Sequence, residues 1–256
     1  MRVAVAAGIV IFLIILGCPV RAMQALAPPP QHTEVFNTAK EATWGVALLR
    51  FTPGGELETV ALSGSGFFVS NRHFVTAAHV IDTRALLGRT RGPRDEIRVF
   101  RADPFEDGFH GPLRIVFESG AMDAAVLESS RAASHWLRIA PIDPKEGEEV
   151  GLYGYPLAAW SNKMAPVAFA LGRVGIVAGF GRDGNVRRMV TTLVSNPGNS
   201  GGPVFRLATG EAIAIHKAQL LNPAGQVVDG YSIATLLSNL TPQFQKLGIA
   251  PPRNPP

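Results

Sequence analysis

The chain has 256 residues, of which 46% are hydrophobic and 17% are charged, and its formal net charge is +4. This composition excludes an intrinsically disordered protein, and the length suits one large β domain or two small ones. Arginines gather in residues 84–101 and 182–188 without aromatic stacking platforms or a recognition helix beside them. We therefore interpret these stretches as solvated loops and expect no nucleic-acid partner.

The first 22 residues have the pattern of an export signal. One early arginine precedes an apolar run from Val3 to Leu16, which is shorter than the ~20 residues that span a bilayer. We expect cleavage after Ala22, no transmembrane span, and a periplasmic or secreted protein. The sequence "ILGC" also resembles a bacterial lipobox, so a lipid anchor at Cys18 is an alternative. Cys18 is the only cysteine, and the mature chain is expected to contain no internal disulfide.

After this signal the sequence indicates a proline-rich spacer at 23–40, two β modules at 41–140 and 141–247, and a tail at 248–256. Short runs rich in Val, Phe and Ile alternate with Gly, Pro, Asn and Asp through both modules, which predicts strands. "TPGGEL" and "RDGN" predict hairpin turns. Helical periodicity is confined to about 235–247. The absence of strand–helix alternation predicts an all-β, antiparallel fold with one short C-terminal helix.

Ser200 lies in "SNPGNSGGPVF", where glycines permit positive φ angles and a close approach of the backbone to another group. A serine hydroxyl is a poor nucleophile unless a base activates it and a third group orients that base. His79 ends the apolar run "FVTAAH", and Asp123 begins the strand "DAAVL", where an unpaired charge would be costly. Taken singly, His79 is better explained as a partly buried core histidine, and Asp123 could be a strand-edge cap or a turn residue.

Taken together and in this order, "TAAH", "DAAVL" and "GNSGGP" resemble the trypsin-like, chymotrypsin-fold serine proteases over roughly residues 45–233. The resemblance implies two six-stranded antiparallel β-barrels, with His79 and Asp123 in the first and Ser200 in the second. It also implies that these three residues form a catalytic triad, and that the amides of Gly198 and Ser200 form an oxyanion hole.

Two other classes fit part of this pattern. The serine segment matches the G-x-S-x-G elbow of α/β-hydrolases, but those enzymes place a helix after the serine and the acid and histidine downstream of it. A catalytically silent protease-fold binding module would keep all three motifs. It is the alternative to a serine endopeptidase that hydrolyses peptide bonds through an acyl-enzyme.

Asn199 departs from the digestive proteases, which carry aspartate just before the serine. With asparagine there and no cysteine pairs, the chain is more similar to bacterial proteases of the glutamyl endopeptidase and high-temperature-requirement types. The latter usually carry a C-terminal PDZ domain, which we do not expect here because only a tail follows the predicted helix.

Val194, Ser195 and His216 are the predicted substrate-binding residues. In glutamyl endopeptidases a histidine in an "IH" strand and a hydroxyl residue five before the serine receive the acidic side chain of the substrate, and His216 and Ser195 match them. Both side chains can donate hydrogen bonds to a carboxylate. In the alternative, His216 packs in its strand and a pocket lined by Val194 takes small aliphatic side chains. We expect protein or peptide substrates, no cofactor, and no metal site, because no metal-binding pattern occurs.

Overall fold

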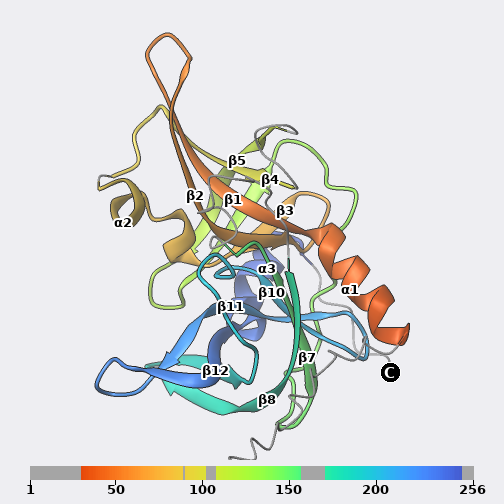
Figure 1. The fold of residues 1–256 in the computed structure, drawn as a ribbon. Coiled ribbons are helices and arrows are strands. Elements are labelled where there is room, and N and C mark those ends of the chain that lie inside the picture. The colour runs from red at the N-terminus through yellow and green to blue at the C-terminus, as the bar shows by residue number, and fades with distance from the viewer. Residues whose placement is uncertain (1–29, 89, 102–107, 157–170, 250–256) are drawn as a thin grey trace, which may run out of the picture.

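Two closed six-stranded antiparallel β-barrels lie one above the other in the computed structural model, which describes residues 30–88, 90–101, 108–156 and 171–249 (Figure 1). The strand order is β1-β2-β3-β6-β5-β4 in the first barrel and β10-β11-β12-β9-β8-β7 in the second. The predicted all-β double barrel is confirmed. The predicted division at residue 140 falls between the last strand of the first barrel and the first strand of the second.

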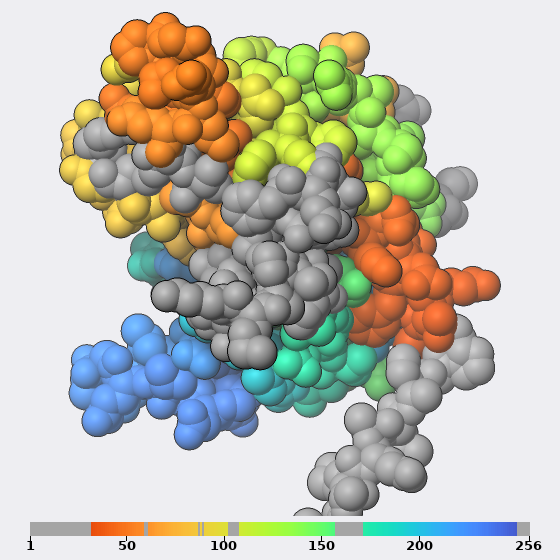
Figure 2. Space-filling model, turned by 45° about the horizontal axis from the view of Figure 1, so that its top comes forward, coloured from red at the N-terminus to blue at the C-terminus, as the bar shows by residue number. Residues whose placement is uncertain are grey.

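The first barrel is built by strands β1 (Thr43–Phe51), β2 (Leu57–Phe68), β3 (His73–Thr76), β4 (Asp95–Phe100), β5 (His110–Ser119) and β6 (Ala124–Ser129). Between β3 and β4 the chain forms a short 3-10 helix, η1 (Ala78–Ile81), and then helix α2 (Thr83–Leu87). The β1–β2 hairpin turns at the predicted "TPGGEL" segment and projects from the barrel, as Figures 1 and 2 show in orange.

The second barrel is built by strands β7 (Glu149–Gly154), β8 (Leu171–Asp183), β9 (Val186–Thr191), β10 (Pro203–Arg206), β11 (Ala212–Leu221) and β12 (Val227–Leu236). The β8–β9 hairpin turns at Gly184, which has φ 59°, where "RDGN" predicts a turn. The β11–β12 hairpin stands out into solvent, in blue at the lower left of Figure 2. The chain then forms a second 3-10 helix, η3 (Leu237–Leu240), and helix α3 (Thr241–Lys246).

The C-terminal helical segment is shorter than the periodicity indicates. Strand β12 continues through Leu236, and helical structure begins only with η3. Alternating small and apolar residues over 232–236 fit a strand paired on both sides, because β12 bonds β11 and β9 simultaneously. Tertiary pairing therefore overrides the local helical signal.

Helix α1 (Pro30–Ala42) occupies much of the stretch that the sequence indicates as a spacer. Proline is tolerated in the first turn of a helix, and Pro30, the last of three consecutive prolines in the sequence, begins this helix. The helix is held by its apolar face: the Phe36 ring lies 5.3 Å from Phe205 and 6.5 Å from Tyr153, both in the second barrel. A Cβ at Gly172 would lie 2.8 Å from Phe36, so a glycine is needed at position 172. We call this packing site, formed by Tyr153, Gly172 and Phe205, the seat of the helix. Figures 1 and 2 show α1 running beside both barrels.

The predicted signal at 1–22, the possible lipid site at Cys18 and nearly all of the predicted tail lie outside the described residues. Within the part of the chain that the structure describes, no helix is both long enough and apolar enough to cross a membrane.

Candidate active site

Asp123 lies at the end of the β5–β6 turn, where its backbone has a φ of 50°, a left-handed conformation that aspartate adopts more readily than most residues. The carboxylate is buried, with its side chain only 9% exposed. It accepts hydrogen bonds from the backbone N–H of His79 (3.0 Å) and from the imidazole Nδ1 at 3.0 and 2.9 Å. Burial by itself would raise the pKa of Asp123, but the hydrogen bonds and charge of His79, together with Lys217, outweigh burial and lower this pKa.

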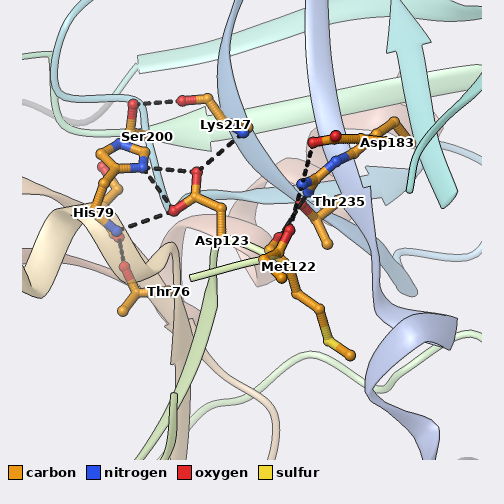
Figure 3. Close-up of polar contacts among 11 residues, drawn as sticks. Thr76, His79, Met122, Asp123, Asp183, Ser200, Lys217 and Thr235 are labelled. Atoms are coloured by element: carbon orange, nitrogen blue, oxygen red, sulfur yellow. Dashed lines mark hydrogen bonds and ion pairs between the residues drawn. The ribbon is translucent and has the colours of Figure 1, made fainter. Parts of the chain in front are cut away.

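His79 lies in η1, directly after β3, and its side chain is 45% exposed. Ala77 and Ala78 precede it and are buried, so the small residues of "TAAH" let the turn pack closely under the imidazole. Because Nδ1 is bonded to Asp123, the ring is fixed with Nε2 free to act toward another group. Figure 3 shows the ring between Asp123 and Ser200.

Ser200 lies in the turn before β10, and backbone hydrogen bonds hold this turn to both barrels. The Ser200 carbonyl accepts from the Ser65 N–H at 2.8 Å, and the Gly201 N–H donates to the His216 carbonyl at 2.8 Å. Gly201 has φ 86°, and a Cβ there would lie 2.0 Å from the Ser65 carbonyl oxygen. Only glycine fits, which explains one glycine of the "GNSGGP" motif.

Ser65 is a site residue that the sequence analysis missed. Its hydroxyl donates to the Gly198 carbonyl at 2.7 Å and accepts from the Tyr155 N–H at 2.8 Å. It thereby joins the first barrel to the serine turn and to the start of the second barrel. The only signal in the sequence is the alternation "SGSG" before the histidine motif, which by itself describes an ordinary strand.

The Ser200 hydroxyl donates to the backbone carbonyl of Lys217 at 2.7 Å, and no hydrogen bond joins it to His79 within the described residues. Figure 3 shows Ser200 next to the imidazole with its Oγ turned toward Lys217. The structure thus brings the three predicted triad residues together, with His79 and Asp123 bonded and Ser200 adjacent. A rotation about the Cα–Cβ bond of Ser200 would redirect Oγ.

The amides of Gly198 and Ser200 have no acceptor among the hydrogen bonds of the described residues. Gly198 has φ 99°, in the left-handed region that favours glycine. Two N–H groups of one turn, next to the serine hydroxyl and without an internal partner, are suited to bind an anionic oxygen.

The predicted specificity residues lie beside this turn. Ser195 Oγ is 2.6 Å from His216 Nε2, and both side chains are buried. Burial, with a smaller contribution from the charge of His79, lowers the pKa of His216 to about 4, so its imidazole is neutral at pH 7. The other ring nitrogen, Nδ1, is buried without a partner among the described residues. Val194 is 55% exposed, so it lies at the open surface beside Ser195 and not in the interior.

A small cavity of ≈ 30 Å³ lies against Val194 and Ser195, with Gln219, Asp229 and Tyr231 on its other sides. Gln219 donates from Nε2 to the Ser195 carbonyl at 3.3 Å, so its side chain crosses one side of the cavity. A cavity of this volume holds about one water molecule. His216 does not line this cavity; it lies behind Ser195.

A larger open hollow of ≈ 530 Å³ lies on the Asp123 side of the imidazole. Its charged lining, besides His79 and Asp123, consists of Asp82, Glu118 and Lys217. Lys217 Nζ lies 3.7 Å from Asp123 Oδ2. Lys217 therefore contacts the site twice, through its carbonyl to Ser200 and through its ammonium to Asp123.

No group of three or more His, Cys, Asp or Glu side chains that could hold a metal ion occurs in the described part of the chain. The described polar groups of the site belong to acid–base and nucleophilic chemistry.

Comparisons with known proteins indicate the family and the fold. A family model described as a trypsin-like peptidase domain matches residues 64–215. A relative named HhoA and described as a serine protease, from Synechocystis sp., is 30% identical over 166 residues, 62% of this chain and 37% of that protein. A DegP-like protein from Ectopseudomonas mendocina, described as a periplasmic serine endoprotease, is 28% identical over 199 residues, 77% of this chain and 36% of that protein.

The chain spans little more than a third of the length of these two relatives. Among solved structures, the active form of the Rv3671c protease from M. tuberculosis superposes with a TM-score of 0.60. The superposition covers 87% of this chain and 88% of the Rv3671c protease chain, at 17% sequence identity. This likeness shows the shared fold alone.

Proposed function

Because the chain belongs to the trypsin-like peptidase family, we propose that it is a serine endopeptidase that hydrolyses peptide bonds through His79, Asp123 and Ser200. The observation that supports this most directly is the bidentate bond of the Asp123 carboxylate to His79 Nδ1, at 2.9 and 3.0 Å, beside Ser200. Such a bond fixes the imidazole tautomer with its proton on Nδ1, which leaves Nε2 as the base.

In this mechanism Ser200 Oγ first turns from the Lys217 carbonyl toward His79 Nε2. His79 takes the hydroxyl proton while Oγ attacks the carbonyl carbon of the scissile bond, and Asp123 stabilises the imidazolium that forms. His79 then gives the proton to the leaving amine. Water, deprotonated by the same base, hydrolyses the acyl-enzyme and regenerates Ser200.

The unpartnered amides of Gly198 and Ser200 would bind the oxyanion of the tetrahedral intermediate. In acyl transfer the loss of one such donor raises the barrier by about 3 kcal/mol, so the turn that presents them contributes as much as a good general base. Ser65 would hold this turn in place through the Gly198 carbonyl.

Labelling with a fluorophosphonate tests the proposal without a known substrate. We expect the wild-type chain to react covalently at Ser200, seen as a mass increase on the peptide that contains it. The Ser200→Ala variant should keep the wild-type circular dichroism spectrum and take up no label. A folded wild-type protein that resists the reagent over the whole range of pH from 6 to 9 would instead support the catalytically silent binding module.

We also propose that Ser195 selects the substrate side chain, and that an acidic residue is preferred before the scissile bond. Nδ1 of His216 is buried without a partner, and a buried N–H without an acceptor is costly. His216 therefore carries its proton on Nε2 and donates to Ser195 Oγ, which leaves the Ser195 hydroxyl proton free to point into the cavity. A hydroxyl donor there would bind a carboxylate.

The small cavity volume supports the competing preference for small aliphatic side chains, and Asp229 on the cavity wall would oppose an acidic one. Cleavage of a peptide library by wild type, Ser195→Ala and Gln219→Ala separates the two. Preference for Glu or Asp that disappears in Ser195→Ala supports the acidic pocket. Preference for Ala or Val that Ser195→Ala leaves unchanged and Gln219→Ala broadens to larger residues supports the aliphatic one.

Finally, we propose that the protein is exported, supported by the apolar N-terminal stretch of the sequence and by the description of one relative as periplasmic. The intact mass of the protein from cells should correspond to a start near Met23, or to an acylated Cys18. A cytosolic chain that still begins at Met1 would overturn this proposal.

A further inference from the structure

Asp123 Oδ2 is shared by two nitrogen groups from opposite barrels. His79 Nδ1 lies 2.9 Å from it, and Lys217 Nζ lies 3.7 Å from it. Figure 3 shows the ammonium and the imidazole converging on the one carboxylate. When His79 is neutral, this oxygen faces one positive charge, the Lys217 ammonium. When His79 is protonated, it faces two, the ammonium and the imidazolium.

We propose that Lys217 is a positioning residue that sets the pH range in which His79 can act as the catalytic base. This inference rests on the proposed serine endopeptidase function. The ammonium holds Asp123 ionised and in place, and it repels the proton that His79 would bind in the resting enzyme. The base then stays neutral, and therefore active, at a more acidic pH than a neutral side chain at position 217 would allow.

The local exposure makes this charge effective. The Asp123 side chain is only 9% exposed and that of Lys217 is 32% exposed, so water and salt screen the pair incompletely. The β11 backbone at Lys217 lies against the serine turn, because its carbonyl accepts a hydrogen bond from the Ser200 hydroxyl. The side chain therefore leaves the backbone beside the two reacting groups.

Other titratable groups lie near His79, and the two carboxylates among them oppose the effect of Lys217. Asp82 follows η1 and Glu118 lies on β5; both line the open hollow beside the imidazole and both would favour its protonated form. His216 on β11 is buried and, with a pKa of about 4, is neutral in the range where His79 acts. Among the residues that line this hollow, Lys217 is the cation, and it disfavours the protonated form of His79 that the carboxylates favour.

The test follows the second-order rate of fluorophosphonate labelling from pH 4.5 to 9.5 in wild type, Lys217→Met and Lys217→Arg. We expect the midpoint of the acid limb to move up by about 0.5 to 1 pH unit in Lys217→Met, the range expected for the loss of a like charge at a partly exposed site. Lys217→Arg retains the charge and should keep the midpoint near that of wild type. The difference between wild type and Lys217→Met should shrink in 1 M NaCl.

Lys145→Met serves as the matched control, because it removes one exposed lysine that makes no ion pair among the described residues. It should leave the midpoint unchanged, which separates a local charge effect from a change in net charge. A midpoint in Lys217→Met that stays within about 0.2 pH unit of wild type, or that moves down, overturns the proposal. So does a shift that Lys217→Arg reproduces, because a purely steric role would then explain it.

A direct titration decides the matter if a variant labels too slowly to measure. Nuclear magnetic resonance of protein with isotope-labelled histidine follows His79 itself, assigned by comparison with His79→Gln. We expect the same upward shift of its titration midpoint in Lys217→Met, and an unmoved midpoint overturns the inference. This measurement also separates the two proposals: a wild-type chain that never labels refutes the peptidase function, while the titration still reports whether Lys217 controls His79.

Discussion

The two barrels share a strand plan but differ in what they bury. The main apolar cluster is centred on the first barrel and takes in Phe67, Phe68, Phe74 and most of the large buried side chains around them. The cluster proper to the second barrel is smaller. Buried polar side chains occur in both barrels, but among the described barrel residues those with a guanidinium, amide or imidazole group, Arg188, Asn199, Arg206 and His216, all lie in the second.

This difference separates two ways of placing a reactive group. The first barrel holds His79 and Asp123 through packing beneath them, and their own hydrogen bonds complete the pair. The serine turn and the specificity residues of the second barrel are held by hydrogen bonds, within that barrel and to Ser65 of the first, which depend on geometry and, at His216, on protonation. The first half should therefore respond to changes in volume, and the second half to changes in polarity and pH.

The largest effect is expected from a substitution that removes the contribution of the first barrel to the site. Asp123→Asn should lower kcat by about 10⁴-fold, because an amide in that place stabilises the wrong imidazole tautomer and no longer opposes the imidazolium charge. The labelling rate or cleavage of an unfolded protein substrate measures it. Glu118→Gln, which removes an exposed carboxylate of the same hollow, should change the rate only several-fold. A loss below tenfold in Asp123→Asn would contradict the assignment.

Phe74→Ala tests the apolar core of the first barrel. Phe74 is fully buried, with its ring 5.0 Å from Phe68 and packed against Gly66. Its truncation should lower the free energy of unfolding by about 3 to 5 kcal/mol through lost burial and the cavity left behind. Urea denaturation measures the change, and Leu57→Ala in the exposed β1–β2 hairpin should stay within about 0.5 kcal/mol of wild type. Equal effects at the two positions would refute a packing-controlled first barrel.

The pH dependence of stability that His216 causes tests the polar interior of the second barrel. Because burial lowers its pKa in the folded state to about 4, the folded chain binds fewer protons than the unfolded chain between pH 6.5 and 4. Stability therefore falls as the pH falls through that window. We expect about 2 to 3 kcal/mol less stability at pH 4.5 than at pH 7, of which His216→Gln removes most.

The quantity to compare is the change in the free energy of unfolding between pH 7 and pH 4.5. His216→Gln also alters packing, but it does so at both pH values. His135→Gln removes an exposed histidine and should preserve the wild-type difference. His73, whose pKa burial also lowers, contributes in the same direction and leaves a residual slope in every variant. A wild-type slope that survives intact in His216→Gln would show that another group carries it.

The smallest effect concerns one cross-strand pair of hydroxyls. Thr191 on β9 and Ser232 on β12 are buried with their oxygens 2.8 Å apart. Ser232→Ala or Thr191→Val alone should cost about 1 kcal/mol, because each leaves one buried hydroxyl without its partner. The double variant should cost less than the sum of the two. Strict additivity in urea denaturation would mean that the second barrel does not depend on this pair.

The fold and the neighbourhood of the triad could be predicted because their signals are local. Motifs such as "TAAH" carry both the strand that ends there and the reactive residue, and their order along the chain indicates the class of fold. What escaped prediction joins distant residues. The bond from Ser65 to Gly198 spans 133 positions, and the seat of α1 depends on Phe205, so no window of sequence contains both partners.

The resting position of Ser200 also escaped prediction, for a different reason. The resemblance implies a serine directed toward the base, whereas the hydroxyl is bonded to the Lys217 carbonyl. A side-chain rotamer is chosen by acceptors that compete within hydrogen-bond distance, and only the assembled turn shows which acceptors are there. Lys217 itself was visible in the sequence as a charge, but its pairing with Asp123 needs the docking of the two barrels.

Helix α1 has a consequence for the way the protein is made. It leaves the ribosome before either barrel, yet Phe36 finds its partner rings only at Tyr153 and Phe205, more than a hundred positions later. Throughout that interval Phe36 lacks its partner rings, and transiently exposed apolar surface is what chaperones hold and what aggregates. The Phe205 contact becomes available only after the segment that carries Ser200 has been synthesised, so a chain that ends before Ser200 lacks both this contact and the nucleophile.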